Sequence, residues 1–227
     1  GISGNGFCGT LDGDNHVIYG SYYEDKVTSS NYMAGLLFFG LNGKGQIKNL
    51  GIAKSRLDTK VAGSGCEGGA FAGYKHEWNG IDGNGVVFEN CFVDDTVYLL
   101  GKCVAGFVGI SRFAGSKITI NNCYSAANLT GGQFARAFVC WTWDESGPNS
   151  GITIQNSYST SDCKSGFVSK GANINNCYVL ANNGSADNNA DVTMLTIAQM
   201  TGANAYTNMP NLDYNNVWQV FEGTTPK

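Results

Sequence analysis

Six phenylalanines recur along this chain at intervals of 29 to 36 residues, and each lies in a short apolar segment. In the first four segments, FCG, FFG, FAG and FVG, a glycine follows the phenylalanine by two residues, whereas Cys140 and Ser169 replace that glycine in the last two. The six positions are Phe7, Phe38, Phe71, Phe107, Phe138 and Phe167. A segment that recurs with a period of about 20 to 50 residues is typical of solenoids, in which each repeat is one supersecondary unit.

A second repeated segment, centred on asparagine, follows these apolar segments. It reads IKNLGI, FENCFV, INNCYS, IQNSYS and INNCYV in successive repeats. Its central residues are Asn49, Asn90, Asn122, Asn156 and Asn176. We assign one apolar position before the asparagine to Ile18, Ile47, Phe88, Ile120, Ile154 and Ile174, and the position after it to Leu50, Cys91, Cys123, Ser157 and Cys177. Two such segments in each repeat predict two strands in each turn.

These segments predict a parallel β-helix. Before about residue 190 the apolar residues show no helical spacing, whereas short apolar runs bounded by Gly, Asn, Ser and Asp are frequent. Parallel strands about 4.8 Å apart place equivalent residues of successive repeats in contact. We therefore expect an all-β solenoid of about six coils, on the order of 30 Å long. The asparagines are expected to stack as a hydrogen-bonded ladder at a corner of each coil.

Residues 1–227 are expected to form a single domain, with repeats over about 5–180 and a C-terminal cap over about 190–227. A cap is needed because the last coil would otherwise expose unpaired strand edges and an open core. The sequence begins partway into the first coil, so we expect it to be processed or excised from a larger protein.

The cap is predicted to contain a short helix from about Thr196 to Ala203. Trp218 and Val220 are expected to belong to the same cap. The apolar face of the helix is formed by Met194, Leu195, Ile197, Met200 and Ala203.

The composition favours an extracellular or cell-surface protein that is not disordered. The chain has 32 glycines, 14% charged residues and a net charge of −4. This mild acidity, with no cluster of Lys and Arg, argues against nucleic acid or an anionic membrane as the partner. No apolar run approaches the roughly 20 residues that cross a bilayer, so membrane insertion is not expected.

The eight cysteines do not form a metal-binding pattern. No CxxC is present, and neither His16 nor His76 is at ligand spacing from a cysteine, so we expect no metal and no cofactor. The cysteines of the asparagine segments are expected to pack as small apolar residues. Cys66 and Cys103 precede the phenylalanines of successive coils by five and four residues, and they are the most plausible disulfide pair.

Nearly the whole sequence resembles the GLUG-motif β-helices of bacterial surface and secreted proteins. The resemblance is carried by FCGTLDGDNHVIYG, AGLLFFG, IKNLGI, the repeated INNCYS elements and the closing NMPNLDYNNVWQVFEGTTPK. It implies a right-handed parallel β-helix within a larger, adhesin-like or peptidase-associated protein. It implies no active site, because the matched residues are ladder and turn residues. Cys140 and Ser169 depart from the pattern, since they stand where it has glycine.

A strip of aromatic residues is expected on the outer face of the asparagine segments. If the residue after each asparagine points inward, the next residue points outward. The residues of this strip are Phe92, Tyr124, Tyr158 and Tyr178, with Gly51 at the same position of the earlier coil. A flat exposed strip would stack on sugar rings or on a partner protein. A half-buried stack that stabilises neighbouring coils explains the same residues, and we favour it.

A second candidate site lies in the loops that follow the phenylalanine strands. Its residues are Tyr74, His76, Trp78, Arg112, Trp141, Trp143 and Asp144, from three consecutive coils. Two indoles two residues apart, with a carboxylate beside them, suit stacking on a sugar ring and hydrogen bonding of its hydroxyls. Inward packing of the same tryptophans is the alternative, and it is slightly favoured.

An enzymatic role finds little support in the sequence. The adjacent Asp94 and Asp95 would point to opposite faces of a strand, so they cannot act on one glycosidic bond. No histidine lies in a nucleophile elbow. We therefore predict a non-catalytic module, monomeric within a multidomain chain, that serves adhesion or recognition of a glycan or a cell-surface protein. A rigid spacer is the alternative, and a polysaccharide-degrading β-helix enzyme is the second alternative.

Overall fold

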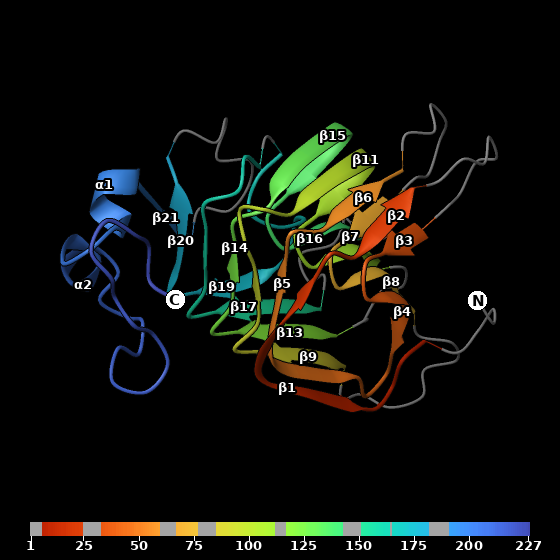
Figure 1. Ribbon diagram of the computed structural model, residues 1–227, viewed down its shortest axis with the longest axis horizontal. Helices are drawn as coiled ribbons and strands as arrows, with labels where there is room; N and C mark the ends of the chain where they lie inside the picture. Colours follow the sequence, from red (N-terminus) through yellow and green to blue (C-terminus); the bar gives the residue numbers. More distant parts are fainter. Residues whose placement is uncertain are drawn as a thin grey trace.

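The computed structural model describes residues 6–24, 33–59, 67–76, 85–111, 117–142, 151–163, 165–181 and 191–227. Within this part of the chain the protein is a parallel β-solenoid with little helix (Figure 1). All pairs of strands are parallel, and each strand pairs with the equivalent strand of the next turn. The prediction of an all-β parallel β-helix is confirmed.

The strands form three sheets around one core. The 11-stranded sheet contains β1 (Thr10–Tyr19), β5 (Gln46–Ala53), β9 (Val86–Glu89), β10 (Phe92–Val93), β13 (Ile118–Asn121), β14 (Tyr124–Ser125), β17 (Ile152–Gln155), β18 (Tyr158–Ser159), β19 (Asn173–Asn175), β20 (Cys177–Leu180) and β21 (Val192–Leu195). The 6-stranded sheet contains β2 (Tyr22–Glu24), β3 (Met33–Gly35), β6 (Arg56–Asp58), β7 (Glu67–Gly69), β11 (Tyr98–Ala105) and β15 (Asn128–Arg136). The 4-stranded sheet contains β4 (Phe38–Asn42), β8 (Ala72–His76), β12 (Val108–Ser111) and β16 (Val139–Thr142).

The solenoid has fewer complete turns than the six coils predicted from the sequence. The smallest sheet has four strands, β4, β8, β12 and β16, so at most four turns contribute a described strand to every sheet. The later turns continue only in part: the backbone N–H of Phe138 donates to the carbonyl of Phe167 at 3.2 Å, although Phe167 lies in no strand.

Stacked phenylalanines fill the centre of the solenoid, as the repeat predicts. Phe107 lies between Phe71 and Phe138, with ring centroids 4.9 Å and 5.1 Å away, and Phe138 meets Phe167 at 4.8 Å. Opposite this row, the apolar residues before the asparagines also stack in register, from Ile47 to Ile174. Because each ring contacts the turn on either side, neighbouring turns are tied together by the core.

The first turn does not follow the predicted register. Leu11 pairs with Ile47, whereas Ile18 pairs with Ile52, so the assignment of Ile18 to the first apolar row is wrong. An irregularity between Asp12 and His16 shifts the register there, and Asp14 and Asn15 within it have left-handed backbone angles. This local bulge inserts residues that cannot be predicted from the repeat pattern.

The asparagine ladder is present, and its backbone conformation explains the residue type. The five central asparagines all have φ between 51° and 53°, the left-handed region that asparagine tolerates better than most residues. Asn49 bends the chain within β5, and each of the other four bends it between two short strands, for example between β9 and β10. Amide hydrogen bonds join Asn49 to Asn90, Asn90 to Asn122, and Asn156 to Asn176. Asn156 instead donates to Asn121 on its other side, which interrupts the predicted ladder at one step.

The C-terminal segment contains two short helices, α1 (Ile197–Met200) and α2 (Asn204–Asn208), which lie beside β20 and β21 (Figure 1). Thr196 caps α1 in a capping box with Gln199, and the chain becomes extended again at Thr201. The predicted helix from Thr196 to Ala203 is therefore shorter than expected and ends at Met200, and its apolar face is only partly buried. Leu195 and Met200 are buried, whereas Met194 and Ile197 are exposed.

Candidate functional site

The predicted aromatic strip lies on the outer face of β10, β14, β18 and β20, and its rings stack from Phe92 to Tyr158. The rings of Phe92 and Tyr124 are parallel within 6° at 5.0 Å, and those of Tyr124 and Tyr158 within 9° at 5.3 Å. Tyr178 pairs in register with Tyr158. Gly51 precedes them, and the ring of Phe92 occupies the place that a side chain at Gly51 would take.

The strip is not an exposed binding surface. Tyr124, Tyr158 and Tyr178 are 6%, 0% and 3% exposed, so the interpretation as an open aromatic platform is wrong for these three residues. Only Phe92 is partly accessible. The alternative, a stack that stabilises adjacent turns, describes the tyrosines.

The C-terminal segment covers the strip. Trp218 lies 5.3 Å from the ring of Tyr158 and 6.2 Å from that of Tyr124. The backbone N–H of Asn211 donates to the hydroxyl of Tyr178 at 3.3 Å. From the sequence this segment is expected to cover the end of the solenoid, whereas in the structure it also packs against the outer face that carries the tyrosines. The row of outward tyrosines in the sequence was the signal for this contact, because an apolar strip of that size requires a cover.

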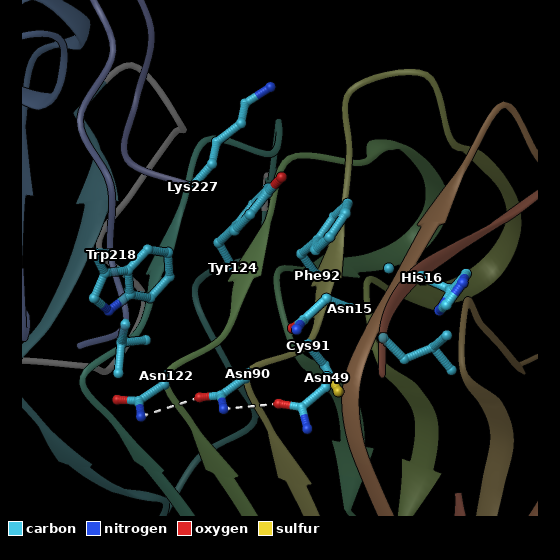
Figure 2. Close-up of a pocket in the computed structure, with 13 residues that line it drawn as sticks. Asn15, His16, Asn49, Asn90, Cys91, Phe92, Asn122, Tyr124, Trp218 and Lys227 are labelled. Carbon is cyan, nitrogen blue, oxygen red and sulfur yellow. Dashed lines mark hydrogen bonds between the residues drawn. The ribbon is translucent and has the colours of Figure 1, made fainter. Parts of the chain in front are cut away.

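A groove of about 160 Å³ opens where this cover ends (Figure 2). We call it the ladder groove. Its walls are the asparagine ladder, the exposed end of the aromatic strip and the edge of the C-terminal segment. The lining residues are Asn15, His16, Asn49, Leu50, Gly51, Asn90, Cys91, Phe92, Asn122, Tyr124, Val217, Trp218 and Lys227.

Side-chain amides form the polar wall of the ladder groove. Asn122 donates to Asn90 at 3.2 Å, and Asn90 donates to Asn49 at 2.9 Å (Figure 2). Asn49 in turn donates to Asp12 at 3.0 Å. Each bond uses one N–H of a carboxamide that has two. Because Asn156 donates to Asn121 and not to Asn122, this run of hydrogen bonds ends at the carboxamide oxygen of Asn122. The wall therefore presents both donors and an acceptor.

Aromatic rings form the opposite wall. Phe92 presents a ring beside the ladder, and Tyr124 and Trp218 continue that wall toward the C-terminal segment (Figure 2). Burial raises the pKa of the Tyr124 phenol, and the nearby carboxylates of Asp94 and Asp95 raise it further. The phenol is thus neutral at physiological pH.

Polar and charged groups lie at the rim of the groove. His16 and Lys227 are exposed, and the imidazole Nδ1 of His16 is 2.9 Å from the carbonyl of Gly13. Hydrogen bonds from Asn49, the backbone N–H of Asp14 and Lys48 lower the pKa of Asp12 to about 2. Asp12 is therefore an anion that anchors the first amide of the ladder.

These walls are suited to binding rather than to acid–base chemistry. Amide donors and acceptors match the hydroxyl groups of a sugar, and the aromatic wall matches its C–H face. Among the described residues no group of three His, Cys, Asp or Glu side chains is placed to hold a metal ion.

The loop site predicted from the sequence is described only in part. Tyr74 and Trp141 each pair in register with Ile110, so they lie in one row, on the turns to either side of Ile110. Tyr74 is buried and meets Phe39 edge-on at 5.1 Å, which corrects the expectation that it projects into solvent. Trp141 is partly exposed and His76 ends β8. Four further residues of that prediction, Trp78, Arg112, Trp143 and Asp144, lie outside the described residues.

The predicted Cys66–Cys103 disulfide is contradicted by the structure, in which Cys103 is a free thiol. Cys66 lies outside the described residues. Cys103 packs instead with Cys140 of the next turn, in a small cluster outside the main core. A hydrogen bond from Cys140 lowers the pKa of the Cys103 thiol. The disulfide prediction failed because it compared only cysteines that precede the phenylalanine of their coil. Cys140, which packs with Cys103, follows the phenylalanine of its coil.

No helix in the described ranges has the length and apolar character that crossing a membrane requires. Comparison of the chain with models of protein families, with curated proteins and with solved structures gives no match. The likeness to GLUG-motif proteins therefore stays a prediction that rests on the repeated segments.

Proposed function

We propose that this protein is a non-catalytic extracellular module of a bacterial surface or secreted protein and that it recognises a glycan in the ladder groove. The observation that carries the proposal is the placement of a row of side-chain amides opposite an accessible aromatic ring in one depression. The predicted aromatic loop around Trp141 belongs to the same proposal as a second contact region.

The physical argument concerns the two faces of a sugar. A pyranose presents hydroxyls at its edge and C–H groups on its face. Carboxamides that are held in register by their neighbours lose little conformational freedom when they bind hydroxyls. Phe92 supplies a rigid surface for the C–H face. The ladder groove offers both within one site, and its rim carries His16 and Lys227 as further donors.

A rigid spacer is the second candidate. It is favoured by the continuous core, in which stacked rings join successive turns without a break between Phe71 and Phe167. A spacer requires no ligand, so the two candidates differ in a measurable way.

The test is a glycan array followed by calorimetry with the best ligand. Phe92→Ala removes the accessible ring of the groove, and Phe39→Ala removes a ring that is 49% exposed on another sheet. We expect Phe92→Ala to weaken the affinity about tenfold or more, and Phe39→Ala to leave it unchanged. Wild-type affinity in Phe92→Ala overturns the groove as the site, and absence of binding to every glycan favours the spacer.

A further inference from the structure

Two exposed tyrosines lie on alternate strands of the 6-stranded sheet, with an arginine between them. Tyr22 on β2 pairs with Arg56 on β6, and Arg56 pairs with Tyr98 on β11. Tyr22 is 64% exposed and Tyr98 is 51% exposed, and the side chain of Arg56 is 46% exposed. We call these three residues the tyrosine row. It was not recognised in the sequence because the strands β2 and β6 contain three residues each and carry no repeated phrase.

The tyrosine row belongs to a face distinct from the ladder groove. The strands β2, β6, β11 and β15 lie side by side (Figure 1). The strands that carry the asparagine ladder belong to the 11-stranded sheet. A ligand on the tyrosine row would therefore not compete for the residues of the groove.

Hydrogen bonds along the strands hold two of the three side chains flat. The hydroxyl of Tyr22 donates to Glu24 at 3.0 Å, and the guanidinium of Arg56 donates to Asp58 at 3.2 Å. In both cases the partner is two residues further along the same strand and hence on the same face. Both hydrogen bonds therefore draw the side chains along their strands and limit how far they can project from the sheet.

The spacing of the row matches an extended sugar chain. Tyr22 and Tyr98 are separated by two strand spacings, which is about 9.6 Å. A β-1,4-linked chain of pyranoses is an extended ribbon whose repeat contains two rings and is close to this length. Tyrosines on alternate strands can therefore stack on alternate rings, while Arg56 lies under the intervening ring, where its donors meet hydroxyls.

The charges on this face favour a neutral chain. Arg56 is paired with Asp58, and Glu24 accepts from Tyr22, so neither charge is free to balance a uronate. The bond to Glu24 also raises the pKa of the Tyr22 phenol, which keeps its ring neutral. An anionic polysaccharide would meet the exposed carboxylate of Glu24, and the guanidinium of Arg56 is already paired with the buried Asp58.

We propose that the tyrosine row binds a neutral, β-1,4-linked polysaccharide whose chain runs across the strands, along the solenoid axis. This inference rests on the proposed role in glycan recognition and adds a second surface to it. A ligand must span Tyr22 and Tyr98, so at least three consecutive rings are required.

The test uses the whole chain with microcrystalline cellulose and chitin beads, and calorimetry with cellohexaose, cellobiose and maltohexaose. We expect retention on at least one of the two solids, binding of cellohexaose, and much weaker binding of cellobiose, which cannot reach both tyrosines. Maltohexaose is not expected to bind, because α-1,4 linkages curve the chain away from a flat row.

Variants distinguish this surface from the ladder groove. The double variant Tyr22→Ala with Tyr98→Ala is expected to lose about tenfold or more of the affinity, and Tyr22→Trp with Tyr98→Trp is expected to retain it. Phe92→Ala in the groove should not change retention on the solids. Equal binding by the double alanine variant, equal affinity for cellobiose and cellohexaose, or no retention on either solid overturns the proposal. In the last case, array binding that depends on Phe92 would leave the proposed function intact.

Discussion

The hydroxyl of Tyr158 lies 3.1 Å from the hydroxyl of Thr225, across 67 residues of sequence, and the two hydroxyls are hydrogen-bonded. The single hydrogen of the Tyr158 hydroxyl is donated to the carbonyl of Pro226, so the Thr225 hydroxyl donates to the Tyr158 oxygen. Tyr158 is completely buried, and the ring of Trp218 packs against it. This contact fixes the end of the C-terminal segment on the outer face of the solenoid, so the segment is part of the folded domain.

Removing this hydroxyl should loosen the C-terminal segment selectively. We expect Tyr158→Phe to lower the free energy of unfolding by about 1 to 2 kcal/mol, because the carbonyl of Pro226 loses its donor and the hydroxyl of Thr225 loses its acceptor. Hydrogen exchange of residues 191–227 should accelerate more than that of the strands. Tyr206→Phe is the control, because Tyr206 is 51% exposed; equal effects of the two variants would contradict the assigned contact.

Alkaline pH should release the same segment. Burial raises the pKa values of Tyr124 and Tyr158 above that of a free tyrosine. In the unfolded chain both phenols titrate near pH 10, so above about pH 10 the unfolded state holds fewer protons than the folded state. The stability that these groups contribute is complete below that pH and falls as the pH rises.

Denaturant titrations between pH 8 and pH 11 measure this loss. Each buried phenol contributes a slope of about 1.4 kcal/mol per pH unit above pH 10, and Tyr124→Phe should reduce the total slope by that amount. An unchanged slope in Tyr124→Phe would show that its phenol is not buried in solution.

The repeat made the rows of the core predictable, and local irregularities made the site unpredictable. The positions of Phe107 and Asn90 follow from spacing alone, because equivalent residues of parallel turns must stack. The register of the first turn does not, since a bulge before His16 leaves no mark in the repeat. The place of the C-terminal segment is also hidden, because it depends on long-range packing of Trp218 on the tyrosines. The ladder groove combines both of these features, so only the structure reveals it.

Two replacements of Asn90 should separate the contribution of its left-handed backbone to stability from that of its side-chain hydrogen bonds. Its φ is 53°, and its side-chain amide takes part in two hydrogen bonds of the ladder. We expect Asn90→Ala to cost about 2 to 4 kcal/mol, of which about 1 to 2 kcal/mol is the left-handed conformation of a residue with Cβ. Asn90→Gly loses the same hydrogen bonds without that strain.

The measurement is the urea midpoint of each variant. Asn90→Gly should therefore be more stable than Asn90→Ala, although it has the larger conformational entropy when unfolded. If alanine is equal to or better than glycine, the left-handed backbone at this corner is not maintained in solution.

The thiols should differ widely in reactivity. Cys8 is exposed, whereas burial raises the pKa of Cys123 well above its usual value and that of Cys177 to about 12. We expect alkylation at pH 8 to modify Cys8 first and Cys103 second, since a hydrogen bond from Cys140 lowers the pKa of the Cys103 thiol. Peptide mapping by mass spectrometry in a Cys66→Ser background reads the order, and early labelling of Cys123 would contradict the buried row.

The phenylalanine row allows a comparison between the middle and the end of the solenoid. Phe107 is completely buried and contacts three rings, those of Phe71, Phe88 and Phe138, at 4.9 to 5.4 Å. Phe7 is only partly buried and stacks on the single ring of Phe38 at 4.5 Å. Removing the ring of Phe107 leaves a cavity that is flanked on both sides, so Phe107→Ala should cost about 3 to 5 kcal/mol.

Phe7→Ala should cost less, because the first turn has a neighbour on one side only and can relax without disturbing the next. Thermal and urea unfolding of the two variants measure the difference. Equal losses of free energy would mean that the first turn is supported as fully as the middle one, and the stacking order from Phe7 to Phe167 would then not describe the stability of the solenoid.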